Sequence, residues 1–344
     1  MGHNARLTAP VYVRIMRVIA SALLALACVL VLAAGADGRR ERIPWLTFNE
    51  VTLSGHKRVL SQHDIFPQES SYSAKRRQLA YVPYYADGFR SNRLWVADVD
   101  SSADRLVYEA QAWITDIAWS PDGETIAFIS GGIWLISPDG TNLRRLGEPG
   151  AFPAWSPDSS RIAYMVLTGG HWLIRILSLG SGSTRDLVYG QNFQWSPDGT
   201  RISYEKVGGG PCKIQIRIVT LQNGKERAIA CGSLPRWSPT AMRIAFVRYD
   251  DHTTSLWILS SGGGRPRRVA TARGGGAEAA VWSTDSSAIA FRQGTRYCAS
   301  QLSVVRLDGS RPRRLAAHTR IVTPLTWSPD ARRVLYAGER CSDQ

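Results

Sequence analysis

Short apolar stretches recur along most of the chain, each at a fixed distance behind a large aromatic residue. Trp119 is followed by the turn sequence Ser-Pro-Asp-Gly and then by the apolar residues 126–128. The same pattern or a close variant begins at Trp155, Trp195, Trp237, Trp282 and Trp327. The turn sequence predicts a tight turn, because Pro presets φ, Asp caps the turn and Gly tolerates positive φ. Each copy therefore predicts a short β-hairpin.

A second hairpin follows each first one except the last. Residues 133–136 and 143–146 flank another Ser-Pro-Asp-Gly turn, and apolar and polar residues alternate along residues 214–218 with the period of a half-buried strand. Two hairpins make a four-stranded unit of about forty residues, which is the size of a propeller blade.

Counting the hairpins predicts how the array ends. Tyr72 takes the Trp position in an upstream copy, which makes seven first hairpins. The last copy has no second hairpin, whereas residues 47–60 form a second hairpin with no first. We therefore predict an all-β fold, a β-propeller of seven four-stranded blades, with six as the alternative. The N-terminal hairpin would complete the C-terminal blade and close the ring, which removes open sheet edges.

The N-terminal segment has the features of an export signal. Arg6, Arg14 and Arg17 precede an apolar run over residues 18–34, and small residues follow at 34–36. This pattern predicts a signal peptide at residues 1–36, although the long run leaves an uncleaved membrane anchor open. In either case the basic residues before the run place the rest of the chain outside the cytoplasm. The predicted organisation is a signal segment at 1–36, a linker at 37–46 and a single propeller domain at 47–344.

Net charge adds one constraint on partners. The chain has 42 Lys and Arg against 28 Asp and Glu, a net charge of +14. The signal segment carries three arginines and no acidic residue, so its removal leaves +11. Basic pairs recur on the predicted fourth strands: Lys57-Arg58, Arg144-Arg145, Arg267-Arg268 and Arg313-Arg314. Charge on an exposed edge strand discourages edge-to-edge pairing, so we interpret the excess as edge protection rather than a nucleic-acid surface. An anionic envelope component remains a possible partner.

The repeated Trp-Ser-Pro-Asp-Gly followed by Ile-Ala-Phe resembles the TolB-type, WD-like β-propeller repeat family over nearly all of residues 45–344. The resemblance implies a propeller in an exported or periplasmic protein. We expect no counterpart of the α/β domain of TolB or of the hydrolase domain of family peptidases, and no Gly-x-Ser-x-Gly nucleophile motif occurs in the sequence. We expect a propeller alone, and that fold by itself defines no function.

The repeated residues have structural explanations. One repeat position holds Asp122, Asp158, Asp198, Asp285 and Asp330, which we interpret as turn caps. Four further tryptophans, Trp95, Trp134, Trp172 and Trp257, recur on the predicted third strand and are assigned to the blade framework. Function is therefore sought where the repeat breaks. We call the face that carries the loops between second and third strands and the connections between blades the loop face, and the opposite face the turn face.

The candidate binding residues lie on the predicted loop face, where loops on a rigid scaffold commonly carry sites. They are Tyr84, Tyr85, Asp87, Arg90, Trp113, Tyr249, Asp250, Asp251 and His252. Aromatic residues with scattered Asp and Arg suit carbohydrate or peptide binding, and ordinary solvated loops are the alternative.

Histidines give only a weak metal hypothesis. His63 and His318 hold equivalent positions on neighbouring blades, and His171 and His252 are assigned to the same face. No HxH or HxxxH spacing supports a site. We therefore predict no metal and no cofactor, with His63 and His318 as the weak candidates.

Four cysteines follow the signal segment, and four allow three pairings. Cys212 and Cys231 bracket one hairpin and predict a disulfide that clamps its loop-side end. By elimination Cys298 would pair with Cys341. An oxidising compartment permits both bonds.

These observations favour an exported, non-catalytic scaffold that binds a protein or a cell-envelope polymer through its loop face. The alternative is a propeller enzyme, a polysaccharide lyase or hydrolase that acts at the channel mouth, so enzymatic activity stays open. We expect a monomer with no nucleic-acid partner, and membrane contact only through the N-terminal segment if it is uncleaved.

Overall fold

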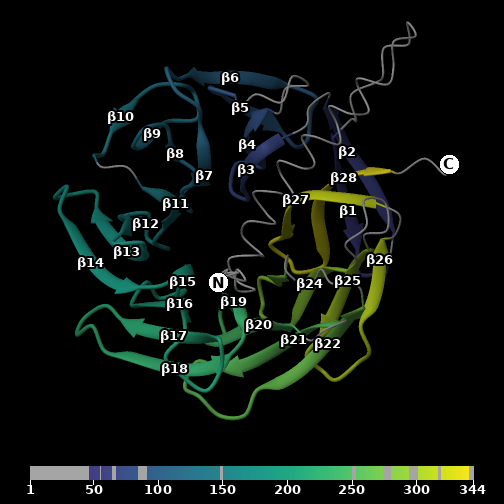
Figure 1. The fold of residues 1–344 in the computed structure, drawn as a ribbon. Coiled ribbons are helices and arrows are strands. Elements are labelled where there is room, and N and C mark those ends of the chain that lie inside the picture. Colours follow the sequence, from purple (N-terminus) through teal and green to yellow (C-terminus); the bar gives the residue numbers. More distant parts are fainter. Residues whose placement is uncertain are drawn as a thin grey trace, which may run out of the picture.

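A computed structural model shows seven four-stranded antiparallel sheets arranged as blades around a ring, as predicted (Figure 1). The structure describes residues 46–54, 56–63, 67–83, 91–147, 150–249, 253–273, 280–293, 301–316 and 319–340. The predicted signal segment, residues 1–36, lies outside these ranges. Within them the structure contains no helix with the length and apolarity that a membrane span requires.

The first four blades each use consecutive strands. Blade 1 contains β3 (Pro67–Ser73), β4 (Gln78–Pro83), β5 (Arg93–Asp98) and β6 (Asp104–Glu109). Blade 2 contains β7 (Thr115–Trp119), β8 (Ile126–Ile129), β9 (Ile133–Ile136) and β10 (Arg144–Arg145). Blade 3 contains β11 (Ala151–Trp155), β12 (Arg161–Thr168), β13 (His171–Ser178) and β14 (Thr184–Tyr189). Blade 4 contains β15 (Gln191–Trp195), β16 (Arg201–Val207), β17 (Ile214–Thr220) and β18 (Glu226–Cys231).

The last blade joins the two ends of the chain. Blade 5 contains β19 (Ser233–Trp237), β20 (Arg243–Tyr249), β21 (Thr253–Ser260) and β22 (Arg267–Arg273). Blade 6 contains β23 (Val281–Trp282), β24 (Ala288–Gln293), β25 (Gln301–Arg306) and β26 (Arg313–Ala316). Blade 7 combines β27 (Thr319–Trp327) and β28 (Arg333–Arg340) with β1 (Leu46–Thr52) and β2 (Lys57–His63). The N-terminal hairpin therefore supplies the outer half of blade 7 and closes the ring, which confirms seven blades over six.

The hydrophobic core lies between neighbouring blades. In one layer, Leu94 and Val96 of blade 1 pack with Trp119, Ile126 and Phe128 of blade 2. The innermost tryptophans also link the blades by hydrogen bonds to carbonyls of the preceding inner strand. These bonds run from Trp155 Nε1 to Ala118 O (3.0 Å), Trp195 to Ala154 (3.0 Å), Trp282 to Arg236 (3.0 Å) and Trp327 to Val281 (3.1 Å). The tryptophan repeat thus fixes the spacing of the inner strands around the ring.

The turn between first and second strands has the same hydrogen bonds in most blades. The Ser156 hydroxyl donates to Asp158 Oδ1 at 2.5 Å, and the same oxygen accepts the backbone N–H of Ser160. The Ser156 bond, followed by the Ser160 bond, lowers the pKa of the Asp158 carboxyl to about 2. Equivalent serine–aspartate bonds occur at Asp122, Asp198, Asp285 and Asp330. The repeated aspartates are therefore turn caps, as interpreted from the sequence.

The basic residues of the outermost strands do more than protect edges. One ladder position of the fourth strand holds an arginine in every blade: Arg58, Arg105, Arg144, Arg185, Arg227, Arg267 and Arg313. Five of these side chains donate to backbone carbonyls in the turn after the third strand of the next blade: Arg105 to Pro138, Arg185 to Leu221, Arg227 to Ser261 and Gly262, Arg267 to Leu307, and Arg313 to Leu53 and Ser54. We call the seven the clasp arginines. Part of the positive charge therefore connects blades at the rim.

Candidate functional site

The exposed large apolar side chains are concentrated on the loop face. Nine such residues are exposed among the described part of the chain, and six of them lie at loop-face strand ends or connections: Trp113, Phe152, Leu167, Tyr189, Val207 and Tyr249. Three of these six belong to blade 3. Since a soluble surface rarely gathers large apolar side chains in one place without a use, blade 3 is the strongest candidate for an interaction site.

The loop-face edge of blade 3 is an apolar ridge that runs from the innermost strand to the outermost strand. Phe152 lies on the inner strand and contacts Trp172 edge-to-face, with ring centroids 6.4 Å apart. Leu167 pairs with Trp172 in the ladder between β12 and β13. His171 contacts Tyr189 of the outermost strand edge-to-face at 6.3 Å. We call Phe152, Leu167, His171, Trp172 and Tyr189 the blade 3 ridge. All four strands of the blade contribute to it.

The ridge corrects one assignment made from the sequence. Trp95, Trp134 and Trp257 are equivalent, since they pair with Tyr81, Phe128 and Phe246. In blade 3 the equivalent position, opposite Tyr164, is held by Arg175. Trp172 lies three residues earlier, at the loop-face end of β13. Its assignment to the repeated framework was therefore wrong, because apolar spacing alone did not fix the register of the third strand.

The inner strands contain a repeated β-bulge that the sequence did not predict. The pairing register shifts within β7, β11, β15 and β19. Each bulge holds a non-glycine residue at positive φ: Asp116 (49°), Phe152 (56°), Asn192 (48°) and Leu234 (54°). Asp and Asn tolerate this left-handed conformation best, whereas a bulky residue there costs about 1–2 kcal/mol. Phe152 combines that strain with 42% exposure, so the bulge directs a large aromatic side chain toward solvent.

A buried carboxylate supports the neighbouring bulge. Glu205 is 1% exposed, and its Oε1 accepts the backbone N–H of Leu234 at 2.7 Å. The Nε2 of Gln191, on the paired inner strand, lies 3.5 Å from its Oε2. The equivalent positions in blades 2, 3 and 5 are Ile129, Met165 and Val247. An acidic residue in that apolar series was the available sequence signal, and it was missed.

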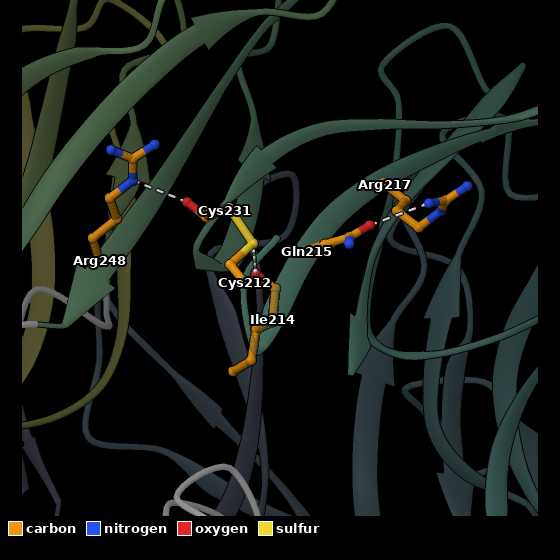
Figure 2. The surroundings of a disulfide bond; sticks show 6 residues. All are labelled: Cys212, Ile214, Gln215, Arg217, Cys231 and Arg248. Carbon is orange, nitrogen blue, oxygen red and sulfur yellow. Dashed lines mark hydrogen bonds between the residues drawn. A yellow bond between two sulfur atoms is a disulfide. The ribbon is translucent and has the colours of Figure 1, made fainter. Parts of the chain in front are cut away.

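The predicted Cys212–Cys231 disulfide is present at the loop-side end of blade 4 (Figure 2), with 5.9 Å between the Cα atoms. Arg248 of blade 5 donates from Nε to the carbonyl of Cys231 at 2.9 Å, and its guanidinium lies 4.4 Å from the Trp257 ring centroid. The disulfide therefore fixes a loop that is also tied to the next blade. Cys298 and Cys341 lie outside the described residues, so their predicted pairing stays a prediction.

Only some predicted binding residues can be placed. Trp113 lies in the connection between blades 1 and 2 and is 59% exposed, and Tyr249 ends β20 of blade 5 and is 43% exposed. Three blades lie between them in either direction around the ring, so they share a face without forming one cluster. The other predicted binding residues lie outside the described ranges: Tyr84, Tyr85, Asp87, Arg90, Asp250, Asp251 and His252.

The histidines are also separated. His63 ends β2, the outermost strand of blade 7, whereas His171 begins the third strand of blade 3. His252 and His318 lie outside the described residues. In the described ranges, no three His, Cys, Asp or Glu side chains come together as metal ligands would.

Solved structures with the same fold come from proteins of several kinds. A structure named for TolB of Agrobacterium tumefaciens aligns with a TM-score of 0.55 at 17% identity, over 86% of this chain and 98% of that one. A chain of a mitotic checkpoint complex aligns with a TM-score of 0.58 at 15% identity, over 90% and 94%. An oligogalacturonate lyase from Vibrio parahaemolyticus aligns with a TM-score of 0.50 at 14% identity, over 65% and 71%. At these identities the likeness shows the propeller fold alone.

No protein-family model and no curated protein sequence matches the chain. Function must therefore be argued from the loop face itself.

Proposed function

We propose that this chain is an exported, non-catalytic scaffold that binds a partner protein through its loop face. The blade 3 ridge is the observation that carries the proposal. It places Leu167 (60% exposed), Tyr189 (53%) and Phe152 (42%) along one blade edge. Covering such side chains removes apolar surface from water, which is the main favourable term in protein association.

The composition of the ridge favours a protein over an envelope polymer. Protein interface cores are enriched in Tyr, Trp and Phe, and energetically important residues are often aromatic. Among the described residues, Leu167 is the most exposed large apolar side chain, and it has no ring to stack on a sugar. A branched aliphatic side chain is best covered by another apolar side chain, which a protein partner supplies.

The strain at Phe152 supports a role in binding. At equivalent bulge positions, Asp116 and Asn192 are residue types that accept positive φ easily, and Leu234 is buried, so it gains packing. Phe152 is both bulky and exposed, so neither conformational preference nor full burial explains it. Backbone strain of this kind is often found at functional sites, so it supports the hypothesis of a functional contact at Phe152.

Export rests on two features. The N-terminal basic and apolar segment has the pattern of a signal peptide or membrane anchor. The Cys212–Cys231 disulfide fits an oxidising, extracytoplasmic compartment. The proposed site of action is therefore the periplasm, the cell surface or the external medium.

The test compares matched leucines on opposite faces. Leu167→Asn places a polar group on the ridge, and Leu143→Asn makes the same change at a 39% exposed leucine near the turn face. The purified proteins would be immobilised, exposed to envelope extracts of the source organism and cross-linked. Mass spectrometry would identify bound proteins and the residues that they touch. A second ridge variant, Phe152→Asn, checks that the result does not depend on one side chain.

We expect one protein to cross-link at the ridge and to bind both ridge variants at least tenfold more weakly, with Leu143→Asn unchanged. A tenfold change corresponds to about 1.4 kcal/mol of binding free energy. Equal binding by Leu167→Asn and Leu143→Asn would contradict the proposal. So would retention of a polysaccharide alone, or turnover in a panel of acidic and neutral polysaccharides, which would instead support the polymer-binding and enzyme alternatives.

A further inference from the structure

The connection between blades 1 and 2 differs from the two connections that flank blade 4. Blades 3 and 4 are joined by Gly190 alone, and blades 4 and 5 by Gly232 alone. At each glycine a Cβ would crowd the next blade, 2.3 Å from the Tyr204 ring and 2.6 Å from the Phe246 ring. Blades 1 and 2 are instead joined by residues 110–114. This longer connection therefore projects from the loop face, whereas the other two connections are single glycines.

The projecting segment is held by buried residues at both ends. Ala110 is 5% exposed and Ile114 is 1% exposed. The backbone N–H of Ala110 donates to Asn92 O at 2.8 Å, and that of Ile114 donates to Ser91 O at 3.1 Å. Asn92 Nδ2 donates in turn to Ala110 O at 2.7 Å.

A further bond ties the segment to blade 2. The Ser130 hydroxyl, at the end of β8, donates to Ala112 O at 3.0 Å. Gln111 and Trp113 are therefore presented on a backbone held from two blades. Such preorganisation reduces the conformational entropy that a ligand must remove on binding.

A depression of about 520 Å³ lies beside this segment, and its volume is in the range of ligand sites. The described residues that line it are Asn92, Gln111, Ala112, Trp113, Thr115 and Gly131. None of them carries a charge. Arg145 donates to the carbonyl of Gly131 at 3.0 Å, and its guanidinium lies 6.0 Å from the Trp134 ring centroid, so this cation is already engaged by a carbonyl and a ring. The lining thus combines one exposed aromatic ring, two amides and one hydroxyl.

We propose that this depression binds a single uncharged sugar residue. A sugar ring offers an apolar C–H face that can cover Trp113, which is 59% exposed. Its hydroxyls are both donors and acceptors, as are the amides of Asn92 and Gln111 and the hydroxyl of Thr115. Among the described lining residues no cation can pair with the carboxylate of an acidic sugar, which would therefore be desolvated at a cost. The site therefore selects neutral sugars over uronic acids.

This site is separate from the blade 3 ridge. The sugar would come from a free glycoside or from one unit of a longer glycan, and both present the same chemistry. Sugar binding is measured on the purified chain without any partner protein, so its failure would leave the protein-binding proposal unaffected.

The experiment measures binding of methyl glucoside and methyl N-acetylglucosaminide by saturation-transfer NMR and titration, with galacturonate as the charged comparison. We expect a neutral glycoside to bind with a Kd of about 1 mM or tighter. Trp113→Ala should weaken it at least tenfold, Trp113→Phe should retain part of the affinity, and Gln111→Ala should give a smaller loss. Leu106→Ala, which alters a 42% exposed residue on the outermost strand of blade 1, should leave it unchanged.

A trisaccharide of each sugar distinguishes the two sources. Equal affinity for monomer and trisaccharide would show that the depression holds one sugar residue, whether free or part of a glycan. Tighter binding of the trisaccharide that still requires Trp113 would show that the depression holds one unit within a glycan. Both results support the site. Absence of neutral-sugar binding, full affinity in Trp113→Ala, or tighter binding of galacturonate would overturn the proposal.

Discussion

The two faces of the ring differ in how closely they follow the repeat. On the turn face, five of the turns share the same serine–aspartate bond, and the residue after the aspartate has positive φ whether it is Gly123, Ser159 or Ala331. On the loop face, one blade connection is a single glycine and another spans residues 110–114. The turn face therefore repeats what the fold requires, while the loop face is where this chain acquires features of its own.

The largest effect should come from removing a tryptophan at the turn-face end of an inner strand. Trp195 is 5% exposed, donates to Ala154 O and lies 4.8 Å from the Arg161 guanidinium. Trp195→Ala should lower the free energy of unfolding by about 3–5 kcal/mol, as other buried aromatic truncations do. The comparison is Tyr189→Ala at the loop face, 53% exposed, which should cost about 0.5 kcal/mol or less. Urea unfolding followed by circular dichroism measures both, and similar losses would contradict the distinction between the faces.

The disulfide should be the main local stabiliser of the loop face. Cys212 and Cys231 are 19 residues apart in sequence. Replacing both by serine should lower the free energy of unfolding by about 3 kcal/mol, because the unfolded chain regains loop entropy. Reduction of the wild-type protein under the same conditions should give a similar shift in the urea midpoint, and the double variant should not respond to reductant. An unchanged midpoint would show that Arg248 and the ladder of blade 4 hold this loop without the bond.

The clasp arginines test whether the basic rim is structural. Arg313 donates to the carbonyls of Leu53 and Ser54, both at 2.8 Å, where blade 6 meets the N-terminal hairpin. Arg313→Gln should cost about 1–2 kcal/mol, since charge-assisted bonds are stronger than neutral ones. Arg314→Gln removes the same charge from the next residue, which is also exposed, and should cost about 0.5 kcal/mol or less. If both substitutions shifted the urea midpoint equally, the basic residues of the outermost strands would serve edge protection alone.

The smallest effect concerns acid stability at the turn face. The Asp158 pKa of about 2 lies below the usual value of about 4, so its stabilising contribution is complete above pH 4 and is lost as pH falls through 2. Ser156→Ala removes the strongest cause and should raise this pKa. The pH-dependent part of the stability difference between wild type and variant should therefore be full above pH 4 and vanish near pH 2. Carbon-13 NMR titration of the Asp158 carboxyl measures the pKa directly, and an unchanged value would assign the shift to the backbone bond.

Prediction from the sequence succeeded where structure is local. A turn sequence and the strands beside it depend on neighbouring residues, so each hairpin could be identified from about ten residues. Ring closure was predicted because the N-terminal end of the repeat array has a second hairpin without a first, and the C-terminal end has a first hairpin without a second. Prediction failed at Trp172, because the register of a strand is set by its partner, and at Phe152, because a bulge shifts one side chain without a clear sequence signal.

The sequence by itself determined the repeat, the number of blades, the closing hairpin and the Cys212–Cys231 bond, because each depends on spacing along the chain. Tertiary structure decided which side chains meet. The ridge joins Phe152 and Tyr189 from the inner and outer strands of one blade, and each clasp bond joins two blades. Those contacts depend on register, bulges and the angle between sheets. Such quantities are fixed only when apolar faces pack together, so the candidate sites emerged from the folded ring.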